Sequence, residues 1–312
     1  MVQTEPVRIG TRGSDLARWQ ARAVQDALAA AHGLPAGAFE TLVIRTSGDR
    51  ITDRALLEAG GKGLFTKEIE EALLDGAIDL AVHSAKDMPT VLPKGLAIAA
   101  YLRREDPRDA FIGNAVARLE ELPAGARLGT ASLRRQALAK RARPDLQVGL
   151  LRGNVPTRLK RIEEGAFDAT LLAAAGLMRL GLHDRAGSLL DLDAFPPACG
   201  QGAIAIECRA DDRRIRDLLS GVGDLDTAVA VACERAFLEA LDGSCRTPIA
   251  GYAAVSGTEL SFHGTVLTPD GTAWHEERAS GPLEDAAEIG LAAGAATKAK
   301  APAAVLAVLG LA

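Results

Sequence analysis

The stretch IDLAVHSAKDMPT, residues 78–90, joins an apolar run to a group of polar side chains. Its first five residues are mostly apolar, as in a buried β-strand. A histidine, a serine, a lysine and an aspartate fill four of the next five positions, and Pro89 then interrupts the regular backbone. Open α/β sheets bind ligands at the carboxyl ends of their strands. The stretch therefore predicts an α/β sheet with chemistry at this strand end, although a surface ion pair between Lys86 and Asp87 would give the same pattern.

Short β-like runs alternate with helical patterns on both sides of this stretch. In the first part of the chain we expect strands at 7–11, 41–46 and 96–100 and helices at 15–31 and 65–74. After the polar segment 103–110 the pattern begins again, with strands expected at 126–130, 147–151 and 168–173 and helices at 133–143 and 155–164. This alternation is typical of βαβ units with a largely parallel sheet. Its repetition predicts two α/β units.

The two units begin alike. Each has a strand, a Gly-Thr pair, a short turn and a serine that can cap a helix, Ser14 in the first unit and Ser132 in the second. Such a turn leaves backbone N–H groups at the positive end of a helix dipole, which suits a carboxylate or a phosphate. Two such turns predict a ligand cleft between the units.

The chain changes character in its last third. The segment AFPPACGQGAIAIECR, residues 194–209, has paired prolines and glycines and predicts a hinge before another buried strand. A helix at 227–241, three β-like runs and an alanine-rich helix at 283–300 follow. We therefore expect a third, smaller α+β domain.

The composition is that of an ordinary globular protein. The chain has 312 residues and a net charge of −5, with 48% hydrophobic and 25% charged residues, which fits two or three domains. Positive charge is nevertheless concentrated between 127 and 161, where ten basic residues face one acidic residue, Asp145; the ten are Arg127, Arg134, Arg135, Lys140, Arg141, Arg143, Arg152, Arg158, Lys160 and Arg161. This segment has no aromatic residue to stack on a base, so nucleic acid is not the expected ligand.

Four of these arginines lie at strand-to-helix junctions. Arg134 and Arg135 are in the first turn of a helix, Arg152 ends a strand, and Arg158 begins the next helix. A cation at a helix N-terminus is unfavourable for the helix dipole, so we expect an anionic partner there. Guanidinium groups bind carboxylates in bidentate fashion, and several together indicate a small polycarboxylate. A nucleotide is less well supported, because GGKGLFTK at 60–67 lacks the P-loop spacing.

Asp87 and one of the four cysteines are candidates for chemical roles in such a site. A carboxylate among cations stays ionised and could stabilise a cation that develops on the ligand. Cys208 and Cys233 lie in apolar patterns typical of a core, whereas Cys199 is ambiguous. Cys245 is in the polar turn DGSCRTP and could anchor a covalent group. The cysteines and histidines have no metal-type spacing, so no metal is expected.

The N-terminus has no basic segment followed by an apolar one, and no apolar run approaches the roughly 18 residues of a membrane helix. We expect a cytoplasmic protein that binds neither membrane nor nucleic acid.

The chain resembles the hydroxymethylbilane synthase family, also called porphobilinogen deaminases, of tetrapyrrole and heme biosynthesis. The resemblance covers nearly the whole chain through blocks in the family's order: IGTRGSDLA, GGKGLFTKEIE, AVHSAKDMPT, REDPRDAF, GTASLRRQ, LRGNVPTRL, AAGLMRLG, GQGAIAIECR and GSCRTPIA. Two departures are Ser244, where a glycine often precedes the cysteine, and Cys199.

The resemblance implies a transferase that deaminates four porphobilinogen molecules and joins them head to tail on a covalently bound dipyrromethane primer. It releases the linear tetrapyrrole hydroxymethylbilane and ammonia. The implied catalytic residue is Asp87, and Cys245 would carry the dipyrromethane through a thioether. The implied cofactor-binding residues are Ser84, Lys86, Thr130, Ser132, Arg134, Arg135, Arg152 and Arg158. The implied substrate-binding residues are Arg12, Ser14, Phe65, Arg179 and Gln201, with Lys62 and Phe65 in a loop that covers the substrate.

The resemblance also implies an α/β fold with two type II periplasmic-binding-protein-like lobes, a hinge, and a smaller C-terminal α+β domain. Lobe 1 would be 1–102 plus 203–221, because the segment after Gln201 returns to its sheet, and lobe 2 would be 108–198. The domain at 225–312 would have a three-stranded antiparallel sheet and the cysteine loop. We expect a monomer that hands its product to uroporphyrinogen-III synthase. The alternative is a non-catalytic two-lobed binding protein for a small polycarboxylate, and the absence of a signal peptide counts against it.

Overall fold

The computed structural model describes residues 5–50, 63–243 and 247–311. Lys62, Ser244 and Cys245, which carry expectations from the sequence, lie outside these residues. The described chain forms two compact units. The first contains the described parts of Met1–Thr52 and Gly61–Glu105 together with Ala203–Ala228, and the second contains those of Asp106–Gly202 and Val229–Ala312.

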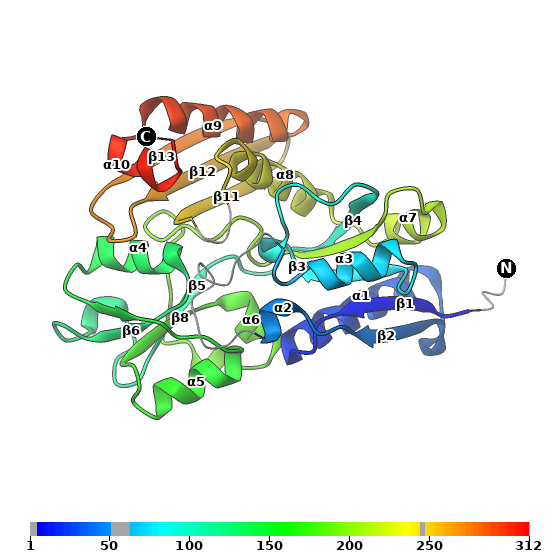
Figure 1. The fold of residues 1–312 in the computed structure, drawn as a ribbon, viewed down its shortest axis with the longest axis horizontal. Helices are drawn as coiled ribbons and strands as arrows, with labels where there is room; N and C mark the ends of the chain where they lie inside the picture. Colours follow the sequence, from blue (N-terminus) through cyan, green and yellow to red (C-terminus); the bar gives the residue numbers. More distant parts are fainter. Residues whose placement is uncertain (1–4, 51–62, 244–246, 312) are drawn as a thin grey trace. The chain divides into compact units, whose positions relative to one another are not determined.

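A five-stranded sheet organises the first unit, in the order β2-β1-β3-β10-β4 (Figure 1). Its strands are β1 (Val7–Thr11), β2 (Phe39–Val43), β3 (Leu80–Ser84), β4 (Leu96–Leu102) and β10 (Ile204–Arg209). The first three strands pair in parallel, and β10 runs antiparallel between β3 and β4. The expected return of the chain after Gln201 into this sheet is confirmed.

Helices cover both faces of this sheet because successive side chains of β3 point in opposite directions. Val82 packs with apolar residues of α1 (Asp15–His32) and α7 (Arg213–Ser220), whereas Ala81 packs with those of α3 (Lys67–Leu74). Ser14 caps α1 as expected, since its side chain accepts the N–H of Ala17 at 3.3 Å. A short helix, α2 (Ser47–Arg50), follows β2.

The second unit contains a similar sheet, in the order β7-β6-β8-β5-β9. Its strands are β5 (Asp109–Gly113), β6 (Arg127–Gly129), β7 (Gln147–Gly149), β8 (Ala169–Ala173) and β9 (Ser188–Leu189). Its helices are α4 (Leu133–Ala142), α5 (Val155–Glu163) and α6 (Ala174–Arg179). β6, β7 and β8 are parallel, and β5 is antiparallel to β8. The expectation of two largely parallel α/β lobes is confirmed, with one reversed strand between neighbours in each.

A separate antiparallel sheet, β11-β12-β13, follows in the chain and confirms the expected α+β domain. Its elements are α8 (Leu225–Ala240), β11 (Ile249–Ser256), β12 (Glu259–Leu267), β13 (Trp274–Pro282), α9 (Ala286–Lys300) and α10 (Ala303–Val308). The helix expected from 283 begins later, because a 3-10 turn precedes it. Such turns occur at Ala36–Ala38, Ala85–Asp87, Leu119–Glu121, His183–Arg185 and Leu283–Asp285. No helix of the described chain is both long enough and apolar enough to cross a bilayer.

Candidate active site

The polar residues that follow β3 lie at the carboxyl edge of the first sheet. A single 3-10 turn, Ala85–Asp87, continues the strand. The turn stops at Met88, which has the extended φ and ψ of −72° and 141° that a following proline favours. Lys86 and Asp87 are therefore fixed within one short turn at the end of a buried strand.

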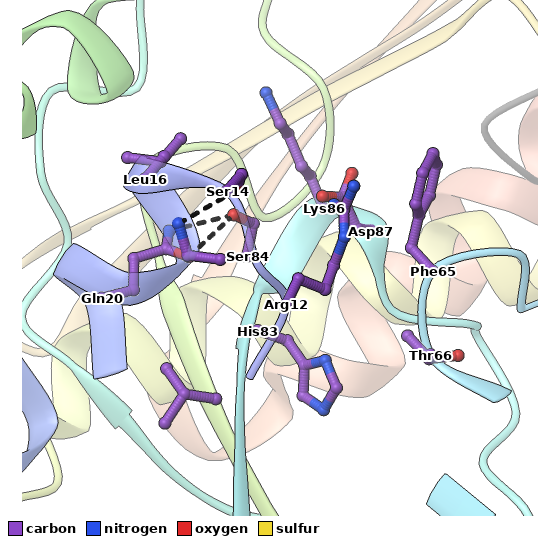
Figure 2. Close-up of a pocket in the computed structure, with 12 residues that line it drawn as sticks. Arg12, Ser14, Leu16, Gln20, Phe65, Thr66, His83, Ser84, Lys86 and Asp87 are labelled. Atoms are coloured by element: carbon purple, nitrogen blue, oxygen red, sulfur yellow. Dashed lines mark hydrogen bonds between the residues drawn. The ribbon is translucent and has the colours of Figure 1, made fainter. Parts of the chain in front are cut away.

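A pocket of about 110 Å³ opens at this edge (Figure 2). Its walls come from the end of β1 and the start of α1, from the residues before α3, and from the end of β3. Six of the residues expected in the site line it, namely Arg12, Ser14, Phe65, Ser84, Lys86 and Asp87. The structure thus brings the expected carboxylate together with expected ligand residues, and their individual roles remain predictions.

Arg12 is held in place by two neighbours. Its guanidinium forms an ion pair with Asp49 and lies over the ring of Phe65, 4.2 Å from the ring centre. Burial raises the pKa of Asp49, but the hydrogen bonds from Arg12 and Thr46 outweigh it and hold that pKa below its usual value. Asp49 is not predicted from the sequence, where its only signal is its place shortly after a predicted strand.

Asp87 differs from Ser84 and Arg12 in having no hydrogen-bond partner among the described residues. Gln20 donates from Nε2 to the Ser84 hydroxyl at 2.9 Å, so the Ser84 side chain is oriented from α1. Within the described residues no hydrogen bond or ion pair involves the half-buried Asp87 carboxylate. This carboxylate is therefore available to a ligand.

In the second unit, Asp109 binds three of the expected ligand residues. Its fully buried carboxylate accepts Arg134 Nη2 at 2.6 Å, Arg135 Nη2 at 2.7 Å and Gln201 Nε2 at 2.9 Å. The sequence predicted an anionic ligand beside the two arginines, and Asp109 supplies a further negative charge there from within the fold. The sequence does not predict this role of Asp109, because the residue lies in the segment 103–110, which has the composition of a polar connection.

The other expected residues of this unit bind the backbone or each other. Ser132 caps α4 by accepting the Arg135 N–H at 3.4 Å, and Thr130 Oγ1 accepts the Ser132 N–H at 3.1 Å. Arg158 donates to the Gly153 carbonyl at 2.8 Å, and the buried Arg179 donates to that of Gly202 at 2.6 Å; Arg152 is half-buried.

Two cysteines are confirmed as core residues. Cys208 and Cys233 are fully buried, and burial raises the pKa of their thiols to about 11 and about 12. Cys199 is also buried, with 5% of its surface exposed.

Comparison with known proteins decides the family. Residues 7–217 match the family model described as porphobilinogen deaminase, dipyromethane cofactor binding domain, and residues 228–299 match that of the porphobilinogen deaminase C-terminal domain. The chain belongs to the porphobilinogen deaminase family. It is 57% identical over 282 residues to the porphobilinogen deaminase of Nitrobacter hamburgensis, and the match covers 90% of this chain and 89% of the relative. The tetrapyrrole-forming activity and the dipyrromethane cofactor expected from the sequence are confirmed.

Solved structures give a more distant likeness. A periplasmic substrate-binding protein of an ABC transporter from Coxiella burnetii has 14% identity and a TM-score of 0.45, over 73% of this chain and 96% of that chain. A putative methionine-binding lipoprotein from Bacillus subtilis has 14% identity and a TM-score of 0.43, over 70% and 91%. These values give no basis for assigning a ligand, so the alternative of a non-catalytic binding protein rests on the fold alone.

The residues of the second unit fit a cofactor with acidic side chains. Each pyrrole of a dipyrromethane carries an acetate and a propionate in this family. Arg134 is 4% exposed, and its Nε has no hydrogen-bond partner among the described residues. A buried donor without a partner costs free energy, and a carboxylate would satisfy it.

Proposed function

We propose that Asp87 carries the chemistry of this porphobilinogen deaminase and that Cys245 binds its dipyrromethane through a thioether. The observation that supports the first assignment is a carboxylate with no partner among the described residues, in a pocket whose other charged lining residues, Arg12 and Lys86, are cationic. Loss of ammonia from porphobilinogen leaves positive charge on the pyrrole. A pair of opposite charges at ~4 Å and an effective dielectric constant of ~20 gains roughly 4 kcal/mol. Realised only in the transition state, this is on the order of a thousandfold in rate.

The remaining expected residues hold the acidic side chains of cofactor and substrate. Ser84, Lys86, Thr130, Ser132, Arg134, Arg135, Arg152 and Arg158 bind the cofactor, and Arg12, Ser14, Phe65, Arg179 and Gln201 bind porphobilinogen. When bound, the dipyrromethane supplies the pyrrole to which new units are joined. Arg12 is already oriented by Asp49 and Phe65, which lowers the entropy lost when it binds a carboxylate.

We also propose that the enzyme is cytoplasmic and monomeric and passes its product to another enzyme. A thioether needs a free Cys245 thiol, which a reducing compartment such as the cytoplasm preserves. Every residue that we assign comes from one chain, which is compatible with a monomer. The released hydroxymethylbilane passes to uroporphyrinogen-III synthase.

The mass of the intact protein tests the assignment of Cys245. We expect the purified wild type to be heavier than its sequence by two linked pyrrole units, and we expect Cys245→Ser to have the unmodified mass. Cys199→Ser is the matched control and should keep the adduct. A wild type of unmodified mass without porphobilinogen turnover would contradict the proposal and favour a binding protein.

Asp87→Asn tests the catalytic carboxylate. The amide keeps the shape of the side chain but removes its charge, so we expect an intact adduct with kcat lowered by on the order of a thousandfold. Asp75, an exposed residue at the end of α3, provides the control Asp75→Asn, which should turn over porphobilinogen like the wild type. Near-normal kcat in Asp87→Asn would remove Asp87 from this role.

A further inference from the structure

A cluster of buried polar residues lies beside the Asp87 pocket and has no part in the mechanism described so far. Thr66, Glu70, His83 and Glu207, here the buried acid cluster, have exposed fractions of 0%, 6%, 5% and 0%. His83 and Thr66 also line the pocket (Figure 2). The cluster therefore connects the protein interior with the site of reaction.

The topology of the first sheet brings these residues together. His83 and Ala81 lie on the face of β3 that α3 covers, opposite to Val82. Glu207 pairs with Ala81 across the antiparallel β10, so its side chain is on the same face. Thr66 precedes α3 and Glu70 lies in its first turn. Strand alternation and the placement of α3 thus enclose two carboxyl groups and an imidazole.

The hydrogen bonds of the buried acid cluster are incomplete. Glu207 Oε2 is 3.1 Å from His83 Nε2, but three buried atoms have no hydrogen-bond partner in the described chain, namely Glu207 Oε1, Glu70 Oε1 and the Thr66 hydroxyl. Burial raises the pKa of Glu70, and the nearby charge of Glu207 raises it further. A proton shared by the two carboxyl groups would remove one of two like charges and would supply a hydrogen-bond donor to an acceptor atom that lacks one.

His83 has one nitrogen committed to the cluster and one that is not. Because Nε2 faces a carboxylate oxygen, the bond assigns the hydrogen to Nε2 and leaves the lone pair on Nδ1. No hydrogen bond to Nδ1 is present among the residues that the structure describes. The charged groups around His83 are Glu207 of β10, Glu70 of α3, and Arg12, Lys86 and Asp87 of the pocket.

Resting on the proposed function, we propose that Glu70 and Glu207 share one proton and that His83 links this pair to the pocket as the acceptor of the proton released in each addition. The C–N bond of porphobilinogen breaks and its electron pair leaves with ammonia. Joining the unit to the receiving pyrrole would replace a C–H bond by a C–C bond, and Nδ1 of His83 would accept the proton that is released. The imidazolium, paired with Glu207, then gives the proton to the ammonia, which leaves as ammonium. No oxidant or reductant is required.

Infrared spectroscopy tests the shared proton without any turnover. At neutral pH we expect a carboxylic-acid C=O band in the wild type, shifted in D₂O, that disappears in Glu70→Gln. Glu234→Gln is the matched control, because Glu234 is equally buried but accepts backbone N–H groups with both oxygens and should contribute no such band. A band that persists in Glu70→Gln overturns the shared proton.

The pH dependence of kcat tests the part played by His83. General acid–base groups contribute about a hundredfold or more, so we expect His83→Gln to lower kcat by about that factor, with the adduct on Cys245 retained and the acidic limb of the pH profile flattened. His83→Asn serves if the first variant folds poorly, as judged by circular dichroism. Unchanged kcat and an unchanged profile overturn the proposal. Porphobilinogen turnover by the wild type stands independently, so this failure is distinct from a failure of the proposed function.

Discussion

At the scale of single residues, the carboxylate of Asp109, which the sequence did not predict, orients two arginines that it did predict. Arg134 and Arg135 were recognised by their position at a helix start, but no local pattern shows that Asp109, some 25 residues earlier, accepts hydrogen bonds from both. Such a partner depends on β5 pairing beside β8, which is a long-range contact. The cations of this group are therefore predictable from the sequence, whereas the anion that orients them is not.

Asp109→Asn should be strongly destabilising. Removing one partner of a buried ion pair costs about 3–5 kcal/mol, because the remaining charge stays buried. Asp106→Asn is the control, since Asp106 pairs with a more exposed Arg108 and should cost at most about 1 kcal/mol. Urea unfolding at pH 7 measures both. Equal losses in the two variants would contradict the importance of the buried pair.

The same residue predicts a loss of stability in acid. Burial raises the pKa of Asp109, but Arg134 and Arg135 outweigh it and hold the pKa well below its usual value. The unfolded chain then binds the proton more tightly than the folded chain, so this stabilisation is complete above the unfolded pKa of about 3.9 and is lost as pH falls below it. The free energy of unfolding should therefore fall more steeply between pH 5 and 3 in the wild type than in Asp109→Asn, because the variant lacks this titrating carboxyl group.

At the scale of elements, helices and strands with clear periodicity were predicted within a few residues, including β1, α1 and α4. The misses were elements without such a signal. β5 begins inside a charged segment, α7 follows the return strand, and β9 has two residues. Each is defined by what it packs against rather than by its own composition, which is why the local pattern was insufficient.

Glu234 connects three elements of the second unit. This fully buried residue of α8 accepts the N–H of Gly200, in the turn before β10, at 2.6 Å and that of Ala253, in β11, at 2.8 Å. Hydrogen bonds to a charged group contribute about 1.5–3 kcal/mol each, so Glu234→Gln should lower the unfolding free energy by roughly 2–4 kcal/mol. Glu239→Gln, an exposed change on the same helix, should have little effect. Chemical denaturation compares the two, and similar midpoints would contradict the role of Glu234.

At the scale of the whole molecule, the two α/β sheets and the antiparallel sheet were predictable because repetition and order along the chain carry that information. The pocket was predictable to a similar degree, since six expected residues line it. The partners Asp49, Gln20 and His83 were not, because each acts through a contact between elements that are distant in sequence.

Alkylation of the buried cysteines tests the stability of two separate cores in one experiment. Cys208 lies in the core of the first sheet, whereas Cys199 and Cys233 lie in the core of the C-terminal domain. Only a thiolate reacts with an alkylating reagent, and a thiol of pKa about 11, as in Cys208, is ionised to only about 0.1% at pH 8. We therefore expect all three to resist iodoacetamide in the native protein and to react once urea unfolds it. If Cys245 carries the proposed thioether, which persists in urea, mass spectrometry should then find three labels on a chain of four cysteines. Rapid labelling of Cys208 in the native state would show that its core opens readily, and a fourth label in a fully loaded sample would show that the cofactor is attached elsewhere.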